Sequence, residues 1–287
     1  MPKPQQIELS EAGIVIPIIY EDRAVLALDK PAGWMLAPDS WDRTGRNLQL
    51  ALQSSMNAGD FWARSRNLKF LRFIHRLDAE TTGLTLFAKS QGALSAYSEL
   101  FEERKVEKTY LAVVEGKPAQ SDWGCNLSLA PDPSHKGQMM IIKEGRVPDR
   151  VPIDSVKQAE TLFKALVSSP RGTLVEAHPL TGRTHQIRVH LMATGHPILG
   201  DPLYGSAQAA VSKGRQKLAL RAVRLSFPDP FQKRQTFINA PSGDFLGEYG
   251  FTNGWHPPGR ETVEPQGVHA PRATAAPAKT PRAMPKP

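Results

Sequence analysis

The chain has 287 residues and a formal net charge of +8 at pH 7, which favours an anionic partner such as nucleic acid, although a basic solvated surface has the same composition. Hydrophobic residues make up 40% of the chain, enough for a sizeable core, and no apolar run is long enough to span a bilayer, so we expect no membrane partner. A single cysteine, Cys125, excludes an internal disulfide and a cysteine-rich zinc site, and it is typical of a reducing cytoplasmic compartment.

Residues 1–13 are predicted to be an N-terminal tail and residues 14–242 one folded domain. Apolar runs and alternation predict strands at residues 13–20, 24–28, 84–88, 109–114, 161–167 and 174–177. Apolar residues at helical spacing predict helices at residues 47–55, 91–103 and 184–193, with Ser90 as an N-cap and Gly195 as a C′ residue. Because strands outnumber helices and no regular helical crossovers separate them, the pattern favours an α+β fold over a doubly wound sheet.

Residues 243–287 are predicted to be a Pro-, Ala- and Arg-rich basic tail. From residue 256 to the end there is no Phe, Trp or Tyr, and eight residues are proline. Such a segment buries too little apolar area to offset the entropy of ordering it, so we expect it to be disordered. Its Lys and Arg residues would add affinity for phosphate, or they would only keep the tail solvated.

The stretch HRLDAETTGLTLFAKS, residues 75–90, places Asp78 on a turn before a predicted strand. Loops held by a rigid strand commonly carry reactive side chains, whereas the structural alternative is that Asp78 caps the turn and pairs with an arginine. The order His-Arg-Leu-Asp differs from the His-Arg-Asp of a kinase, and the chain has no Asp-Phe-Gly, which excludes a kinase. Asp78 and Glu80 would also suit a glycosidase pair, but a separation of two residues gives that reading little support.

Two further stretches carry residues that suit chemistry. In VEKTYLAVVEG, residues 106–116, strand alternation puts Lys108 and Tyr110 on one face, where the tyrosine either packs half-buried or offers a stacking surface to a base. In HPLTGRTHQIRVHLMATGHPILGDPLYG, residues 178–205, Arg183 and Arg188 lie near the start of a predicted helix. An arginine there reaches a carboxylate with two nitrogens, or it contacts a phosphate or solvent.

The histidines of the last stretch invite a metal interpretation. His185 and His190 are five residues apart, about 140° around a helix axis, so they face different directions. With no cysteine nearby to complete a ligand set, we expect no metal site.

Five stretches, in this order, resemble the motifs of the RluA-type pseudouridine synthase family. They are YEDRAVLALDKPAGWMLAP (residues 20–38), HRLDAETTG (75–83), EKTYLAVVEG (107–116), GRTHQIRVHLMATGHPILGDPLYG (182–205) and LALRAVRLSFPDP (218–230). Two positions depart from the usual motifs: Thr82 replaces a serine, and Asp229 stands where relatives often have a histidine. Only about twenty residues precede the first motif, too few for the RNA-binding domain that many relatives carry in front, so we expect a stand-alone catalytic domain.

The resemblance implies a mixed, mostly antiparallel central sheet flanked by helices, and the conversion of uridine within RNA to pseudouridine. The base is detached, turned over and rejoined through carbon, so the reaction implies neither a cofactor nor a metal. Asp78 is implied as the catalytic carboxylate, which attacks the anomeric carbon or removes the neighbouring sugar proton. Arg188 is implied as the salt-bridge partner that keeps Asp78 charged.

Tyr110 is implied to stack on the uracil and to take the proton from carbon five. A free tyrosine, with a pKa of about 10, is a poor base, so this role requires a lowered pKa or a proton relay. Arg76 is implied to fill the place that the everted base leaves.

The remaining candidates shape the pocket or contact the RNA backbone. Pocket-shaping roles are implied for His75, Thr82, Gly83, Ile187 and Leu191. Lys108 and Arg183 are phosphate-binding or structural candidates, and Lys30 is a structural one.

We therefore expect a structured RNA as partner, either rRNA or tRNA, and a monomer without an obligate protein partner. One alternative is a non-catalytic RNA-binding protein of the same fold, against which the intact Asp78, Tyr110 and Arg188 argue. A second is a sugar-nucleotide enzyme or glycosidase acting on small molecules, which would need neither the basic excess nor the basic tail.

Overall fold

The structure is a computed structural model that describes residues 2–9, 12–36, 46–143, 146–206, 217–252 and 254–257. By its internal contacts the chain divides into two units, Met1–His256 and Pro257–Pro287, and the elements below all belong to the first. No helix in the described ranges is long and apolar enough to cross a membrane.

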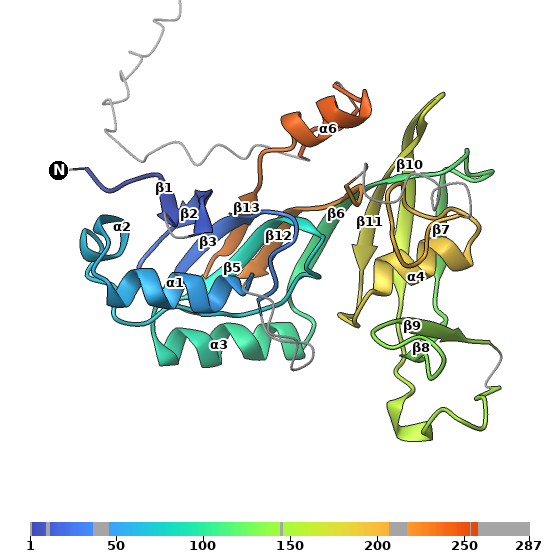
Figure 1. The fold of residues 1–287 in the computed structure, drawn as a ribbon, viewed down its shortest axis with the longest axis horizontal. Helices are drawn as coiled ribbons and strands as arrows, with labels where there is room; N and C mark the ends of the chain where they lie inside the picture. The colour runs from blue at the N-terminus through green and yellow to red at the C-terminus, as the bar shows by residue number, and fades with distance from the viewer. Residues whose placement is uncertain are drawn as a thin grey trace, which may run out of the picture. The chain divides into compact units, whose positions relative to one another are not determined.

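Strands make up most of the regular structure. They are β1 (Gln6–Leu9), β2 (Ile14–Glu21), β3 (Val25–Lys30), β4 (Arg72–Phe73), β5 (Thr82–Ala88), β6 (Glu107–Val114), β7 (Asp122–Cys125), β8 (Ser128–Pro131), β9 (Met139–Ile142), β10 (Thr161–Ser169), β11 (Gly172–Pro179), β12 (Leu220–Pro228) and β13 (Gln235–Asn239). Eleven of them form one sheet, whose main path is β1-β2-β3-β5-β12-β6-β11-β10-β7, while β4 pairs with β5 and β13 with β12. Strands β8 and β9 form a separate hairpin beside α4 (Gln186–Ala193; Figure 1).

The sheet is mixed and mostly antiparallel. Among the described strand pairs only β5 and β12 run parallel, and the others run antiparallel. This confirms the predicted α+β class. The parallel pair joins two antiparallel halves, with β1, β2 and β3 beyond β5 and with β11, β10 and β7 beyond β6 (Figure 1).

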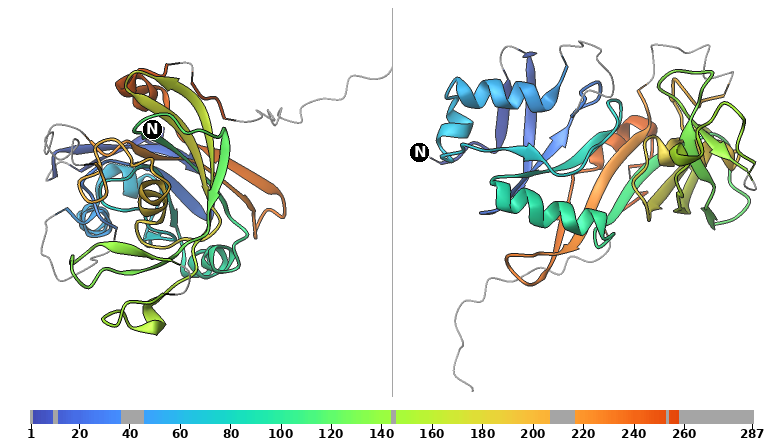
Figure 2. Two further views of the ribbon diagram at one scale, coloured as in Figure 1. Left: turned by 90° about the vertical axis from the view of Figure 1, so that its right-hand side faces the viewer. Right: turned by 90° about the horizontal axis from the view of Figure 1, so that it is seen from below.

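Helices cover both faces of the sheet. Besides α4 they are α1 (Leu48–Asn57), α2 (Phe61–Arg64), α3 (Gln91–Glu102) and α6 (Gly243–Tyr249), with a short 3-10 turn at Ile153–Ser155. Helices α1 and α3 lie on one face and α6 on the other, as the views of Figures 1 and 2 agree. One cluster of buried side chains lies around β5, β6, β11 and β12, and a second lies between β1–β3 and the helices α1 and α2.

The three predicted helices are confirmed as α1, α3 and α4. The Oγ of Ser90 accepts a hydrogen bond from the amide of Ala93 at 3.1 Å and so caps α3. Ala93, Tyr97 and Leu100, spaced one helical turn apart, form the buried face of this helix. Gly195, at φ +85°, ends α4 as expected of a C′ residue.

The structure corrects both ends of the predicted domain. Residues 6–9, predicted as tail, form β1, which pairs with β2 and buries Ile7 and Leu9. At the other end α6 buries Phe245, Leu246 and Tyr249, so part of the predicted C-terminal tail belongs to the core. The alternation of apolar residues in β1 and the four-residue spacing in α6 were too short to stand out in the sequence. Residues 258–287 of the predicted tail lie outside the described residues.

The junction of the two halves requires small residues. Ala222 on β12 lies opposite Gly83 on β5 and opposite Tyr110 on β6. Gly83 has φ +102°, and a Cβ atom added there would lie 2.1 Å from the carbonyl oxygen of Ala222. The two strands therefore approach each other at a distance that only glycine allows.

We predict that Gly83→Ala lowers the free energy of unfolding by ~2 kcal/mol or more, because it adds both steric overlap and backbone strain. Urea denaturation measures the change. Gly92→Ala in α3 is the matched control, because a Cβ there has no neighbour within 4 Å, and we expect it to be neutral or slightly stabilising. Equal stabilities of the two variants would contradict the prediction.

Candidate active site

A cavity of about 560 Å³ lies where the β4–β5 loop, β6 and the start of α4 meet. Most of the residues predicted from the sequence line it. They are His75, Arg76, Asp78, Lys108, Tyr110, Arg183, Ile187 and Arg188. The structure thus brings together residues that lie more than a hundred positions apart in the sequence.

The loop that carries Asp78 is held in place by a buried lysine, Lys30. The Nζ of Lys30 is fully buried and donates to the carbonyls of Ala79 at 2.7 Å, Trp34 at 2.8 Å and Pro31 at 2.9 Å. Burial lowers the pKa of Lys30 to about 8, against the opposing charges of Glu80 and Asp78. These contacts support the structural role predicted for Lys30.

Arg188 lies between two carboxylates. Its Nη1 is 3.5 Å from Oδ2 of Asp78, the contact that the sequence predicts. The tighter partner is Asp201, which accepts from Nε at 2.8 Å and from Nη2 at 2.7 Å in a bidentate pair. Asp78 keeps 23% of its side chain exposed, whereas the side chain of Asp201 is fully buried. Asp201 thus neutralises the arginine while Asp78 faces the cavity.

Asp201 was missed in the sequence, although it lies within the GDPLYG end of the longest motif. The backbone amides of Leu203 and Tyr204 also donate to its Oδ1, at 2.9 and 3.1 Å. Arg188 stacks over the Tyr204 ring at 5.1 Å. Burial alone would lower the pKa of Arg188, but the hydrogen bond and the charge of Asp201 outweigh it and raise the pKa. The guanidinium therefore stays charged although only 3% of the side chain is exposed.

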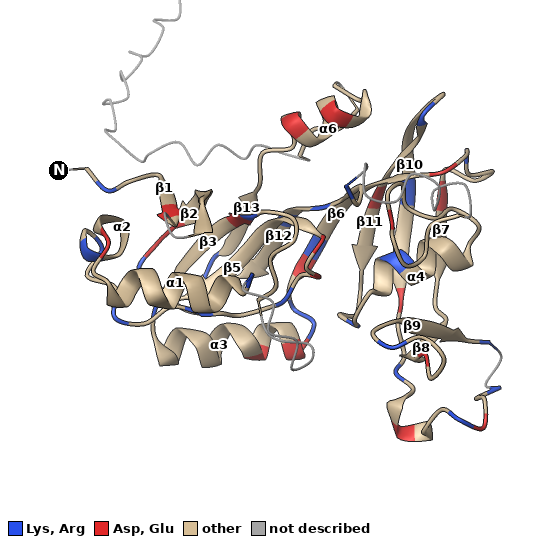
Figure 3. Cartoon of the chain, viewed as in Figure 1, with Lys and Arg blue, Asp and Glu red and all other residues tan. Residues whose placement is uncertain are grey.

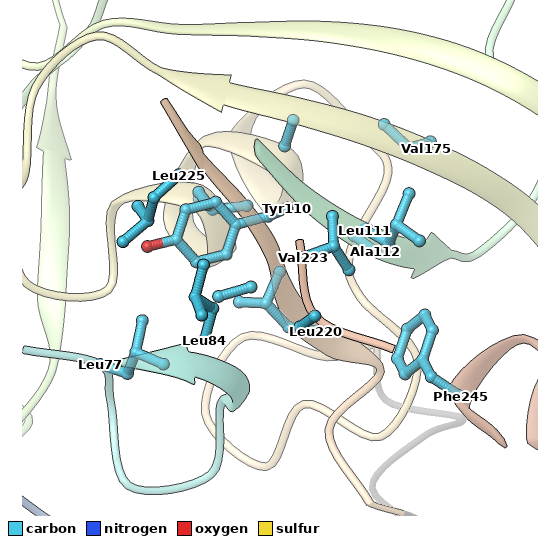
Figure 4. Close-up of a cluster of buried hydrophobic side chains, with 14 of the residues drawn as sticks. Leu77, Leu84, Tyr110, Leu111, Ala112, Val175, Leu220, Val223, Leu225 and Phe245 are labelled. Carbon is cyan, nitrogen blue, oxygen red and sulfur yellow. The ribbon is translucent and has the colours of Figure 1, made fainter. Parts of the chain in front are cut away.

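Tyr110 is a buried phenol at the cavity wall. The residue is 9% exposed, and its ring packs among Leu77, Leu84 and Leu225 (Figure 4). Burial, and then the negative charge of Asp78, raise the pKa of Tyr110 far above its usual value. This direction argues against the alternative of a lowered pKa and favours a proton relay.

His75 is an anchor for the Asp78 loop. Its Nε2 accepts a hydrogen bond from the amide of Leu86 at 3.2 Å, and its ring stacks on Phe101 with centroids 4.8 Å apart. Burial, helped by the nearby positive charge of Lys108, lowers the pKa of His75 to about 3. The imidazole is therefore neutral at physiological pH and joins the loop to β5 and α3.

A series of buried hydrogen bonds holds the cavity wall that is formed by the segment between β11 and α4. The side-chain oxygen of Gln186 accepts from the hydroxyl of Thr181 at 2.6 Å and from the amide of Arg183 at 3.0 Å. Its amide nitrogen donates to Thr161 Oγ1 at 2.9 Å, and Thr161 contacts Nδ1 of His190 at 2.9 Å. These hydrogen bonds fix the segment between β11 and α4, and they were not predicted from the sequence.

The two histidines of this region have different surroundings, as predicted. His185 Nδ1 contacts the hydroxyl of Tyr204 at 2.8 Å, whereas His190 Nε2 contacts the carbonyl of Leu127 at 3.0 Å. Across the described residues, no group of three or more His, Cys, Asp or Glu side chains is placed to hold a metal ion.

Three predicted pocket residues do not line the cavity. Gly83 and Thr82 lie in β5 beside β12, where Gly83 permits the close approach of the strands. Leu191 is fully buried in the core behind α4. The motifs therefore contain positions that shape the sheet and the core, and the prediction wrongly assigned these positions to the pocket. Other cavity residues were not predicted: Met35, Phe101, Arg104, Thr181, His185 and Gln186.

Residues 24–193 match the family described as RNA pseudouridylate synthase. The chain is 35% identical over 232 residues to Ribosomal large subunit pseudouridine synthase C of Vibrio vulnificus, covering 80% of this chain and 66% of that protein. It is 35% identical over 217 residues to Dual-specificity RNA pseudouridine synthase RluA of Vibrio cholerae, covering 75% of this chain and 78% of that protein.

Two solved human structures share the fold. RNA Pseudouridylate Synthase Domain Containing 1 is 26% identical with a TM-score of 0.62, covering 79% of this chain and 83% of that one. RNA Pseudouridylate Synthase Domain Containing 4 is 24% identical with a TM-score of 0.63, covering 82% and 92%. The fold is thus that of a pseudouridine synthase domain.

This chain belongs to the RNA pseudouridylate synthase family, and within it to the RluA type. It spans 66%, 65% and 65% of the length of three curated relatives that it matches, each a Ribosomal large subunit pseudouridine synthase C.

We predict that Asp201→Asn lowers the free energy of unfolding by about 3 kcal/mol or more, because it leaves the buried charge of Arg188 without its main partner. Chemical denaturation measures the loss. A double variant with Arg188→Met removes both charges and should recover part of it. No recovery in the double variant would show that the lost ion pair is not the cause.

The neutral His75 predicts a pH dependence of stability. The unfolded imidazole, with a pKa near 6.5, takes up a proton at a higher pH than the folded one, with a pKa of about 3. This contribution to stability is present above pH 6.5 and is lost as the pH falls towards 3, by up to about 1.4 kcal/mol per pH unit. We expect His75→Gln to flatten the stability curve between pH 6 and 4 and to run parallel to the wild type above pH 7. Parallel curves over the whole range would contradict the assignment.

Proposed function

We propose that the chain isomerises uridine within structured RNA to pseudouridine, with Asp78 as the catalytic carboxylate. One observation carries this proposal: the carboxylate of Asp78 opens to a cavity while the buried Arg188 lies 3.5 Å behind it. Membership of the RNA pseudouridylate synthase family supports the same reaction.

The reaction moves the glycosidic bond from nitrogen to carbon. The bond between C1′ and N1 breaks, a bond between C1′ and C5 forms, the proton on C5 is lost, and N1 gains one. Asp78 acts at the sugar, either by attacking C1′ or by removing the proton on C2′. Both routes need an ionised and accessible carboxylate, which the positive charge of Arg188 favours. No atom is added or removed overall, so no cofactor is needed.

Tyr110 and Ile187 contact the uracil in this proposal. The phenol ring lies at the cavity wall and offers a face on which a base stacks. Because its pKa is raised, the hydroxyl stays protonated and serves as a donor or as part of a proton relay.

The substrate is a structured RNA whose target base is turned out of its helix, at a cost of a few kcal/mol. Arg76 is exposed at the cavity, where its planar guanidinium can fill the vacated place. The name of the Vibrio vulnificus relative, a Ribosomal large subunit pseudouridine synthase, supports rRNA as the substrate, and tRNA is the alternative. The protein acts in the cytoplasm as a monomer without an obligate protein partner.

We predict that Asp78→Asn abolishes pseudouridine formation, with a loss of at least a hundredfold (~10²) in rate, while RNA affinity is kept or slightly increased. The measurement maps pseudouridines across total RNA of cells with the wild-type gene, the variant gene or no gene. RNA binding is measured on the purified variant.

Glu80→Gln is the matched control, because it removes a carboxylate two positions away that is not among the cavity residues. It should leave the pseudouridine map unchanged. If Asp78→Asn forms pseudouridine at the wild-type rate, Asp78 is not the catalytic group. If the wild-type protein binds RNA but modifies no uridine, the alternative of a non-catalytic RNA-binding protein holds.

A further inference from the structure

Three basic side chains from three different elements meet at the cavity. Arg104 follows α3, Lys108 lies on β6, and Arg183 lies between β11 and α4. Figure 3 shows Lys and Arg where α3 leads into β6, and again below β11 where the chain leads to α4. All three side chains line the same cavity as Asp78 and Tyr110.

Lys108 and Arg183 are half-buried and Arg104 is exposed, and the cluster lacks the counter-charge that some other buried or half-buried cations of the protein have. Glu21 pairs with Arg66 and Lys89, and Asp29 pairs with Arg221. Within the described residues, by contrast, no carboxylate lies within 4 Å of the charged nitrogens of the cluster.

The polar contacts of the cluster go to the backbone instead. The Nζ of Lys108 donates to the carbonyl of Thr181 at 3.1 Å, and the Nε of Arg183 to that of Gln158 at 3.0 Å. Burial, and then the charges of Arg104 and Arg183, lower the pKa of Lys108 to about 8. The fold therefore maintains like charges that repel each other, and a bound anion would relieve that repulsion.

The backbone conformation of Arg104 is an independent indication that this side chain has a function. Its amide bonds to the carbonyl of Phe101 at 3.2 Å, and the next amide, of Lys105, bonds to that of Leu100 at 2.8 Å. These two bonds form a Schellman motif, whose C′ residue has a left-handed conformation and is usually glycine. Helix α4 ends in the same way with Gly195, whereas α3 has Arg104 there, at φ +59°. An arginine at this position adds strain that a glycine would avoid.

We propose that Arg104, Lys108 and Arg183 form a site for a backbone phosphate of the RNA, next to the uridine that faces Asp78. This inference rests on the proposed function for its ligand and adds Arg104 as a phosphate-binding residue. The arginines present forked donors and the lysine a point charge, a combination that suits phosphate oxygens. A phosphate held there fixes the position of the neighbouring ribose and offsets the repulsion between RNA and Asp78.

The decisive variant is Arg104→Gly, because it separates stability from binding. A glycine suits the left-handed position, so we expect the melting temperature to stay equal or rise. We expect the affinity for RNA to fall several-fold. A purely structural role of Arg104 would instead lower the melting temperature and leave the affinity of the folded protein unchanged.

Binding is measured by fluorescence anisotropy with a short oligouridylate over a series of KCl concentrations, in the Asp78→Asn background so that no turnover occurs. Each lost phosphate contact should reduce the slope of log affinity against log salt by about 0.7. Arg183→Gln is a second test and should reduce the slope by a similar amount. Lys105→Gln is the matched control, since it removes the same charge one residue away, outside the cavity, and should change neither slope nor affinity.

Slopes of Arg104→Gly and Arg183→Gln equal to that of Lys105→Gln would overturn the phosphate site. This readout needs no isomerisation, so it can fail while the pseudouridine map still supports the proposed function. The reverse result, a reduced slope in a protein that modifies no uridine, would reject the proposed reaction and leave the phosphate site standing.

Discussion

Arg188 is buried between the carboxylates of Asp78 and Asp201. The site depends on which of the two carboxylates accepts the hydrogen bonds of its guanidinium. A buried cation without a partner would be strongly destabilising, and Asp201 removes that penalty with two short hydrogen bonds. Asp78 is therefore not needed to neutralise the arginine. Its Oδ2 lies 3.5 Å from Nη1 of Arg188, close enough to interact with the positive charge, and part of its side chain stays exposed. A bidentate pair between Arg188 and Asp78 would have stabilised the carboxylate equally well, but it would have occupied the oxygens that the proposed reaction requires.

The position of this pair follows from the junction in the sheet. Strands β5, β12 and β6 lie side by side, and Ala222 in the middle strand is opposite both Gly83 and Tyr110. Small residues there bring the Asp78 loop, which precedes β5, close to the tyrosine on β6. Lys30 then ties the loop to the turn after β3, because it donates one hydrogen bond to the carbonyl of Ala79 and two to the carbonyls of Pro31 and Trp34. Gln186 fixes the segment between β11 and α4. Buried polar groups with satisfied hydrogen bonds therefore support the cavity from both sides.

The sequence predicted those features of the structure that produce a local pattern or belong to an ordered motif. The capped helix α3, the glycine at the end of α4, the α+β class and the contact between Asp78 and Arg188 are of this kind. It did not predict Asp201 as the tighter partner of Arg188, because a contact between a helix and the loop after it produces no periodic pattern in the sequence. Motif membership also misplaced Gly83 and Leu191, because a position can be part of a motif for packing as well as for binding. Elements as short as β1 and α6 became visible only through their tertiary contacts.

The charge of Asp78 also contributes to the raised pKa of its neighbour Tyr110. Burial is the larger cause of the raised pKa of Tyr110, and the carboxylate is the second. In the proposed reaction Asp78 forms a bond to the sugar or takes a proton, so its charge is lost and the second cause disappears. The phenol then becomes a stronger acid than in the resting enzyme, but burial still keeps it protonated. Tyr110 therefore passes a proton on only if another group accepts it at the same time, which favours a relay over a resident phenolate base.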